Sequence, residues 1–192
     1  IGKQHFMCSN SFNFIPWYFC KIIMTILHNY FSNEWKPDPN KYIYSGWKLL
    51  DKIKEHETIL DIGCGYNLFK PYFENRLYGI DPANDNADEV VSIENFKSNK
   101  KWDVLLCLGS INFGSFDTID NQIKKLVTFV KDNGRIYWRQ NPGVRDHPWK
   151  GVSEIEFFPW TFDLNYYFAD KYDCKVLECK WDINRIYSVW SK

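Results

Sequence analysis

Short apolar runs alternate with helical stretches over most of this chain. From residue 58 onward these runs cover residues 58–62, 77–80, 89–92, 102–108 and 134–139. Between the last two runs, residues 117–131 carry apolar side chains at helical spacing, and Asn133 followed by Gly134 supplies the stop expected for this helix. Nearly continuous apolar strands that alternate with helices predict a parallel sheet covered on both faces.

The C-terminal end has a different pattern. Two strand-like runs, residues 174–181 and 185–190, are separated only by residues 182–184. That connection is too short for anything but a hairpin. We therefore predict an α/β fold with a Rossmann-like, mostly parallel seven-stranded sheet that ends in an antiparallel hairpin. Rossmann domains that bind NAD generally run parallel throughout, so this ending favours another class of nucleoside-binding domain.

The N-terminal part lacks the alternation of strands and helices. It is apolar and aromatic up to about residue 30, and Pro37 and Pro39 separate this segment from a second helical pattern at residues 42–54. We predict that residues 1–56 form a helical cap, which packs on the same domain as a core formed by residues 57–192.

One N-terminal stretch, residues 11–31, is apolar enough to be tested as a membrane segment. Pro16, Lys21 and His28 interrupt it, and the apolar part is too short for a spanning helix. No basic start or small-residue cleavage site marks a signal peptide. Packing on the body of the protein is the favoured interpretation, and contact with a membrane surface is the alternative.

Composition narrows the class of protein. The 192 residues include 24 basic and 24 acidic side chains, so the formal net charge is zero, whereas a dedicated nucleic-acid binder usually carries a basic excess. The six cysteines form no C-x-x-C pair and the four histidines are scattered, so we predict no metal site. Cysteines inside apolar runs are typical of free thiols in a reducing compartment, and we expect a cytoplasmic protein.

The segment most informative about chemistry is ILDIGCGYN, residues 59–67. A strand runs into a turn in which Gly63 and Gly65 let the backbone bend sharply and approach a ligand, and a short helix is expected around residues 68–74. Asp61 lies at the end of the strand. Sixteen residues beyond Gly65, Asp81 ends the next strand, where a carboxylate can accept hydrogen bonds from both hydroxyls of a ribose.

The glycine pattern argues against a dinucleotide. The dinucleotide fingerprint G-x-G-x-x-G has a third glycine that allows tight packing of the helix on the strand. Here that position is Leu68. A sulfonium cofactor carries no pyrophosphate and does not need this arrangement.

These segments resemble the class I S-adenosylmethionine-dependent methyltransferases, in particular the small-domain group called type 11. ILDIGCG looks like their first motif, LYGIDP is similar to their second, and WDVLLCLGSINF is similar to their fourth strand. The terminal hairpin matches their sixth and seventh strands. The resemblance covers about residues 58–190 and implies S-adenosyl-L-methionine as the cofactor.

The resemblance also implies roles for individual residues. Gly63 and Gly65 would line the methionine and ribose side, Asp61 would organise the amino group, and Asp81 would hold the ribose. Adenine and the remaining backbone contacts complete the implied cofactor-binding set, which is Asp61, Gly63, Cys64, Gly65, Asp81, Pro82, Ile93, Glu94, Leu108 and Gly109. In this set Ile93 and Glu94 fall beside adenine, and Leu108 and Gly109 fall beside the methionine amino group.

Two features depart from the family pattern. Asn67 stands where the family has a glycine, although asparagine tolerates left-handed backbone angles better than most residues. The connection between residues 81 and 89 is too short for a crossover helix, so we expect a loop there and a thinly covered sheet face.

The implied reaction is methyl transfer to a small-molecule acceptor, with an RNA methyltransferase and a non-catalytic binding protein as alternatives. No Asp/Asn/Ser-Pro-Pro-Tyr/Phe motif follows residue 108, so methylation of a base amine is disfavoured. His147 is the candidate general base. Tyr42, Tyr44 and the aromatic residues 157–162 either line the acceptor pocket or simply pack in the fold. The acceptor, the methylated atom and the oligomeric state are not indicated by the sequence.

Overall fold

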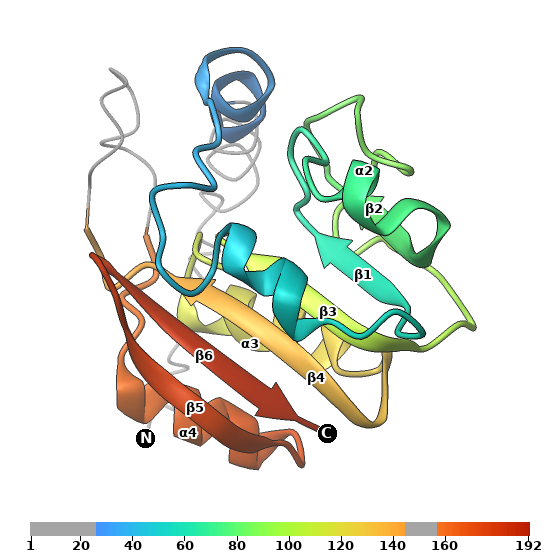
Figure 1. Cartoon of the computed structure of the whole chain (residues 1–192). Helices are drawn as coiled ribbons and strands as arrows, with labels where there is room; N and C mark the ends of the chain where they lie inside the picture. Colours follow the sequence, from blue (N-terminus) through green and yellow to red (C-terminus); the bar gives the residue numbers. More distant parts are fainter. Residues whose placement is uncertain (1–25, 145–156) are drawn as a thin grey trace, which may run out of the picture.

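A six-stranded sheet forms the centre of the computed structural model, which describes residues 26–144 and 157–192 (Figure 1). In this part of the chain the strand order is β2-β1-β3-β4-β6-β5. The strands are β1 (Ile59–Ile62), β2 (Leu77–Ile80), β3 (Trp102–Leu108), β4 (Val130–Gln140), β5 (Lys175–Asp182) and β6 (Arg185–Ser191). β1 to β4 run parallel, and the β5–β6 hairpin joins β4 antiparallel. The mostly parallel sheet with an antiparallel end is confirmed, but with six strands instead of seven.

The strand predicted at residues 89–92 is the one that does not form. Glu89 makes only an isolated parallel bridge with Ile80, and the backbone then bonds to Asp81 through the amide of Val91. The Asp88 side chain also accepts the amide of Gly79 at 2.7 Å on this edge of β2. The chain returns to β2 through a short loop with no crossover helix, as expected, and so it lies along the strand for too short a distance to extend the sheet.

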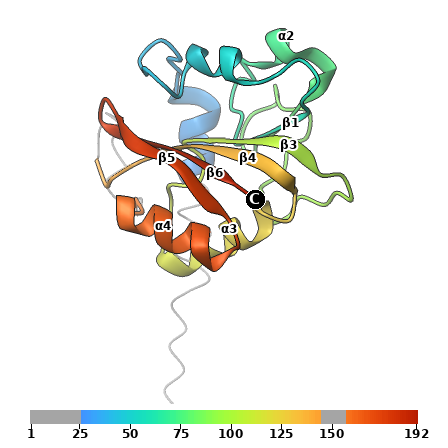
Figure 2. The same ribbon diagram turned by 60° about the horizontal axis from the view of Figure 1, so that its bottom comes forward.

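Helices cover both faces of the sheet (Figure 2). α3 and α4 lie on one face, and α2 lies on the other together with the segment around residue 50. The helical elements are η1 (Tyr30–Glu34), η2 (Trp47–Lys52), α2 (Lys70–Phe73), η3 (Glu74–Arg76), α3 (Phe116–Leu126) and α4 (Phe162–Lys171). Ser115 and Thr161 cap the two longer helices by accepting the amides of Thr118 and Leu164.

The helix predicted at residues 117–131 ends earlier than its pattern indicated. α3 stops at Leu126, and β4 already begins at Val130, which pairs with Trp102. Asn133, with φ of 61°, and Gly134 lie where the β3–β4 register shifts, so they accommodate an irregularity in the strand and do not end the helix. Phe129 and Val130 are buried, and both join β3 through Trp102, whose amide donates to the carbonyl of Phe129.

The helix predicted at residues 42–54 is also shorter, a 3-10 helix at Trp47–Lys52. The helix starts late because the residues before it bind Asp182 of the β5–β6 hairpin. The amides of Ile43, Tyr44 and Ser45 donate to the buried carboxylate of Asp182, at 2.7–3.2 Å, and the Ser45 hydroxyl donates to it at 2.6 Å. The backbone bends through residues 43–46, so three successive amides converge on one carboxylate, and the helix begins only after this bend.

The core consists of two layers, one on each face of the sheet. The larger layer lies between the sheet and α3 and α4, and it includes Leu60, Leu105, Ile123, Trp138, Phe168 and Trp190. The second layer packs η2 and α2 against the opposite face through Leu49, Ile59, Phe73, Val104 and Tyr187. Alternate residues of β1 and β3 enter opposite layers, which follows from the twofold periodicity of a strand.

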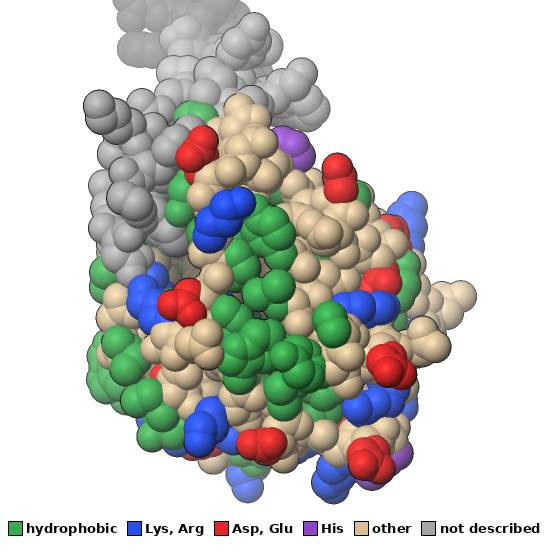
Figure 3. Space-filling view, turned by 45° about the horizontal axis from the view of Figure 1, so that its top comes forward, with side chains coloured by type: hydrophobic (Ala, Val, Ile, Leu, Met, Phe, Trp, Pro, Cys, Tyr) green, Lys and Arg blue, Asp and Glu red, His purple; other side chains and the backbone are tan. Residues whose placement is uncertain are grey.

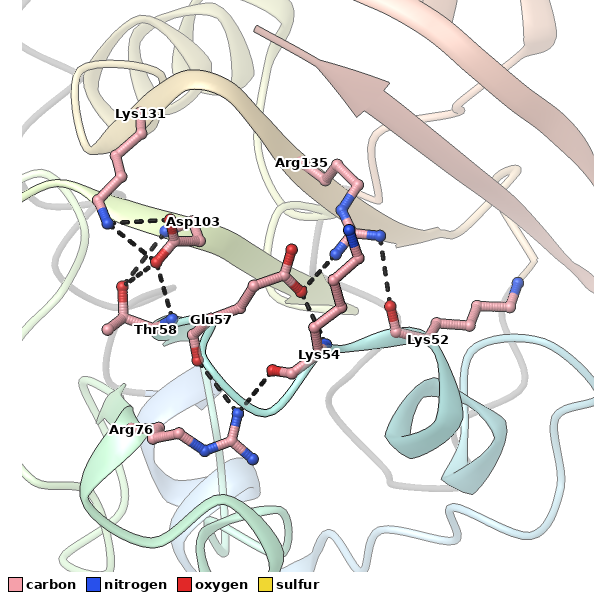
Figure 4. A network of polar contacts seen from close by, with 8 residues as sticks. All are labelled: Lys52, Lys54, Glu57, Thr58, Arg76, Asp103, Lys131 and Arg135. Atoms are coloured by element: carbon pink, nitrogen blue, oxygen red, sulfur yellow. Dashed lines mark hydrogen bonds and ion pairs between the residues drawn. The ribbon is translucent and has the colours of Figure 1, made fainter.

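A network of polar side chains links the amino ends of the central strands (Figure 4). Asp103 accepts the Thr58 amide and hydroxyl at 2.9 and 2.7 Å and pairs with Lys131 at 2.9 Å. Glu57 pairs with Arg135 and accepts the amide of Lys54. Burial alone would raise the pKa of Asp103, but the bonds from Thr58 and the pairing with Lys131 outweigh it and lower the pKa to about 2.

We expect Asp103→Asn to lower the free energy of unfolding by about 1–2 kcal/mol near neutral pH. A folded-state pKa below the ordinary 3.8 means that this stabilisation is present above that value and is lost as the pH falls toward about 2. Urea unfolding of both chains across that range measures the effect, and exposed Asp132→Asn is the matched control. A difference that does not shrink in acid would contradict this assignment.

Candidate functional site

The glycine turn after β1 is held by the next strand. Gly63 and Gly65 adopt φ values of 71° and 54°, in the left-handed region that a side chain disfavours. The amides of Gly63 and Cys64 donate to the carbonyl of Ile80, at 2.8 and 3.1 Å. The turn is therefore fixed against the carboxyl end of β2, at the edge of the sheet where ligands of open α/β folds bind.

Asp81 ties two loops together at this edge. Its buried carboxylate accepts the amide of Gly65 at 2.9 Å through one oxygen and the amide of Ala83 at 2.8 Å through the other. Each carboxylate oxygen still has a second acceptor position. Asp81 can therefore organise the glycine turn and also accept hydrogen bonds from a ligand.

Asp61 is the most perturbed acid in the described part of the chain. It lies at the end of β1, is 4% exposed, and its carboxylate has no hydrogen-bond partner among the residues that the structure describes. Burial, followed by the neighbouring charge of Asp81, raises its pKa to about 7 against the opposing effect of Arg139. A buried, unpaired acid beside a second acid is a site that favours a cationic group.

Two side chains lie directly against the glycines. A Cβ on Gly63 would lie 2.3 Å from the Ser110 Cβ, and one on Gly65 would lie 2.8 Å from the Trp35 ring. Both positions therefore require glycine. The Ser110 hydroxyl is buried with no hydrogen-bond partner in the described structure.

Cys64 and Asn67 pack toward β2. Both side chains lie within 3 Å of the place where a Cβ on Gly79 would stand, and the Asn67 amide donates to the carbonyl of Asn86 at 3.0 Å. Asn67 adopts φ of 54°, so asparagine does support the left-handed turn that the family forms with glycine. Burial raises the pKa of the Cys64 thiol well above its ordinary value, with further increases from Asp61 and Asp81, so this thiol stays protonated.

The end of β3 meets a half-buried arginine from β4. Arg139 donates to the carbonyls of Leu108 and Ser45, and its guanidinium stacks on the Tyr42 ring at 4.3 Å from the centroid. Gly109, with φ of 113°, passes beside the same guanidinium. Burial lowers the pKa of Arg139, but a guanidinium remains charged at neutral pH. Arg139 thus supplies positive charge near Asp61.

The remaining predicted cofactor residues lie farther along the β2 side. Pro82 is exposed directly after Asp81, whereas Ile93 is buried in the larger core layer. Glu94 is exposed and accepts a hydrogen bond of 2.6 Å from Gln122 in α3. The structure therefore brings Asp61, Gly63, Cys64, Gly65 and Asp81 into one cluster, and it places Ile93 and Glu94 at α3.

An aromatic roof crosses this edge of the sheet, made of Phe31, Trp35, Phe113 and Phe157. Neighbouring ring centroids lie 5.7 Å apart for Phe31 and Trp35, 5.5 Å for Phe31 and Phe113, and 5.2 Å for Phe113 and Phe157. The roof joins the N-terminal helix to the loop after β3. Ser32 anchors the same helix to the Asp81 loop by donating to the carbonyl of Ala83 at 2.6 Å.

Three of the predicted acceptor residues have other positions. Tyr44 packs on Tyr187 and under the ammonium of Lys180, and Tyr42 stacks on Arg139. Trp160 is 1% exposed and belongs to the core, where its indole donates to the carbonyl of Ile111. Of the two alternatives for Trp160, packing in the fold is the one that its burial favours. His147 lies outside the described residues.

Sequence reasoning missed Arg139, Ser110 and Trp35. Arg139 had a usable signal, because it is a charged residue at the carboxyl end of an apolar run predicted to be a central strand, where ligands of such folds bind. The sequence carried no such signal for Ser110 or Trp35. Their contacts with the glycines arise from segments far apart in the sequence.

The fold has well-matched relatives among solved structures. A Burkholderia thailandensis 1,6-didemethyltoxoflavin-N1-methyltransferase with bound S-adenosylhomocysteine is 10% identical, covers 91% of this chain and 88% of its own, and gives a TM-score of 0.67. The N-methyltransferase NodS from Bradyrhizobium japonicum is 10% identical over 88% of this chain and 98% of its own, with a TM-score of 0.59. An S-adenosylmethionine-dependent methyltransferase from Clostridium acetobutylicum is 14% identical over 90% and 98%, with a TM-score of 0.58.

The likeness to these proteins is one of fold. No protein-family model and no curated protein matches the sequence. The chain has the fold of the class I S-adenosylmethionine-dependent methyltransferases, with the edge strand beyond β2 reduced to a single bridge. Across residues 26–144 and 157–192, no helix combines the length and the apolar character needed to cross a membrane.

We expect Asp61→Asn to stabilise the protein increasingly as the pH rises. Because the folded-state pKa of about 7 lies above the ordinary 3.8, the native chain is most stable below that ordinary value and loses stability as the pH rises through about 7. The advantage of the asparagine variant should grow by on the order of 2 kcal/mol between about pH 5 and about pH 8. Urea unfolding at both values measures it. An unchanged difference would mean that Asp61 ionises normally.

Proposed function

We propose that this chain binds S-adenosylmethionine at the carboxyl ends of β1, β2 and β3 and transfers its methyl group to a small-molecule acceptor. The observation that carries the proposal is the buried, unpaired carboxylate of Asp61 beside Asp81, across the Gly63–Gly65 turn. S-adenosylmethionine carries an ammonium group and a ribose diol, which are the groups that two acids in this arrangement suit.

The unpaired polar atoms of the site fit this cofactor. The Ser110 hydroxyl is buried without a hydrogen-bond partner in the described structure, and Asp61 is 4% exposed with no hydrogen bond from the described residues and with only the charge of Arg139 opposing that of Asp81. Both residues lie at the edge of the sheet formed by the glycine turn. Buried polar groups normally have hydrogen-bond partners, so the side chains of Asp61 and Ser110 support a ligand with complementary polar groups. Arg139 holds the carbonyl of Leu108 and so orders the backbone that would meet the methionine end.

Each predicted residue has a proposed task in this site. Asp61 would bind the ammonium group, Asp81 the ribose hydroxyls, and Leu108 and Gly109 the methionine end through their backbone. Pro82, Ile93 and Glu94 would bound the adenine side. Bound S-adenosylmethionine would supply a methyl group on an activated sulfonium, so the chain's own residues mainly need to align the acceptor.

The aromatic roof supports a small, partly apolar acceptor. Phe31, Trp35, Phe113 and Phe157 carry no charge and lie over the cofactor end of the sheet. On the face shown in Figure 3, Lys and Arg side chains are interspersed with Asp and Glu instead of forming a basic patch. That distribution favours a small acceptor over RNA, whose phosphates require concentrated positive charge.

Three further proposals concern the general base, the N-terminal segment and the cellular compartment. We propose His147 as the general base for acceptors that must lose a proton. We propose that residues 1–56 act as a cap, since η1 contributes to the roof and η2 packs on the core. Free thiols at Cys64, Cys107, Cys174 and Cys179 support a reducing compartment, which we take to be the cytoplasm.

A non-catalytic binding protein with this fold is the second candidate. One observation favours it, because Trp35 and Ser110 already contact the positions through which a cofactor approaches the two glycines. The two candidates differ in a simple measurement, since only the first requires S-adenosylmethionine to bind.

We expect titration calorimetry to show S-adenosylmethionine and S-adenosylhomocysteine binding in the micromolar range, with no comparable binding of NAD.

Asp81→Asn should weaken binding of S-adenosylmethionine by about tenfold or more, because it removes the charge from a hydrogen-bonding pair. Asp88→Asn is the matched control, since Asp88 also accepts a backbone amide of β2 but lies outside the cluster. Tighter binding of NAD, or equal effects of the two variants, would refute the cofactor assignment.

We expect label from methyl-labelled S-adenosylmethionine to enter a small-metabolite extract and not purified total RNA. The physical reason is the uncharged roof and the dispersed basic side chains described above. Denatured protein serves as the control for chemical methylation. Label that remains in RNA after repeated purification and disappears with nuclease, with none in the metabolite fraction, would establish the RNA alternative instead.

A further inference from the structure

The outer edge of the hairpin is an unpaired strand with large apolar side chains. β5 is the last strand of the sheet, and within the described residues only β6 pairs with it (Figure 1). Leu177 and Trp181 on this strand are each 55% exposed. Natural proteins usually protect such an edge with charge, proline or a covering segment, because its free amides and carbonyls can pair with another chain.

The hairpin geometry determines which backbone groups face outward. The turn consists of two residues, and Asp182 and Arg185 flank it as a hydrogen-bonded pair. Pairs alternate along an antiparallel ladder, so Lys180 also points its amide and carbonyl toward β6. Cys179 and Trp181 therefore direct theirs to the open edge. The register shift between Val176 and Glu178 falls at Leu177, so the regular stretch runs from Glu178 to Asp182.

Glu178 and Lys180 form an ion pair within the chain, and Glu178 also lies 3.9 Å from Lys52. The same alternation of charge along β5 complements a second copy of the strand. If two β5 strands pair antiparallel around a twofold axis at Cys179, Glu178 of each copy faces Lys180 of the other. Leu177, which lies at the register shift, is then the exposed apolar residue nearest to Trp181 of the other copy. Moving the axis by one residue would set Lys180 against Lys180, or Glu178 against Glu178, and like charges directly opposite are destabilising. The sequence of β5 thus favours one register.

We propose that a second copy of this chain docks on β5, extending the sheet across a twofold axis at Cys179. The outward amide and carbonyl of Cys179 would pair with those of the other copy, as the hydrogen-bonded positions of an antiparallel ladder do. Trp181, which already packs against Phe162 of α4, would bury its exposed ring against Leu177 of the second copy. The dimer is a C2 assembly with one self-complementary patch.

Light scattering after size-exclusion chromatography of the full chain tests the association. We expect a dimer for the native sequence. Glu178→Lys and Lys180→Glu should each raise the dimer dissociation constant about tenfold, since each sets like charges opposite, and the double variant E178K/K180E should restore it. Lys171→Glu, which breaks the ion pair with Asp120 on α4, is the matched control. A monomeric native chain, or a double variant no better than either single one, would overturn the proposal.

Cross-linking tests the register independently. Directly opposed hydrogen-bonded residues have Cα atoms about 5.5 Å apart, which is within disulfide reach. Copper phenanthroline as oxidant should join two Cys179 thiols, each giving up a proton and the pair giving up two electrons. We expect peptide mass spectrometry to find a Cys179–Cys179 link, which Cys179→Ser abolishes and Cys174→Ser preserves. A dimer whose cross-links exclude Cys179 would refute this register.

Discussion

The candidate site depends on the way β2 holds the glycine turn that follows β1. The carbonyl of Ile80 accepts two amides of the turn, and the carboxylate of Asp81 accepts a third from Gly65. These bonds require β1 and β2 to be parallel neighbours, because only then do both strands end at the same edge. Asp61, Ser110 and Arg139 are positioned relative to this turn, so a change in the β1–β2 register would displace the whole cluster.

The two ends of the sheet place a carboxylate in opposite environments. At the amino ends Asp103 is fully hydrogen-bonded and paired with Lys131, which favours its charged form and stabilises the fold. At the carboxyl ends Asp61 is buried without a partner, so its charged form is disfavoured. A protein that leaves such an acid unpaired gives up stability at that position, and a functional site is the usual place for that.

A large part of the fold was predictable because it follows from local periodicity. The apolar runs at β1, β2 and β3 and the two-residue turn of the hairpin each carry their own signal. The secondary-structure predictions failed where contacts between distant segments overrode the local conformational preference of the chain. Asp182 captures the amides of residues 43–45 and shortens the predicted helix there, and the short return after Asp81 leaves Glu89 with a single bridge in place of a seventh strand.

The sequence by itself determined the sheet, the glycine turn and the two acids at the ends of β1 and β2, because strand alternation and left-handed turns are encoded in a few neighbouring residues. Only the tertiary structure decided that Asp61 is unpaired, that Arg139 lies between Leu108 and Tyr42, and that Trp35 covers Gly65. These contacts join segments up to about a hundred residues apart, and burial, which sets the pKa of Asp61, is a property of the packed chain and not of its local sequence.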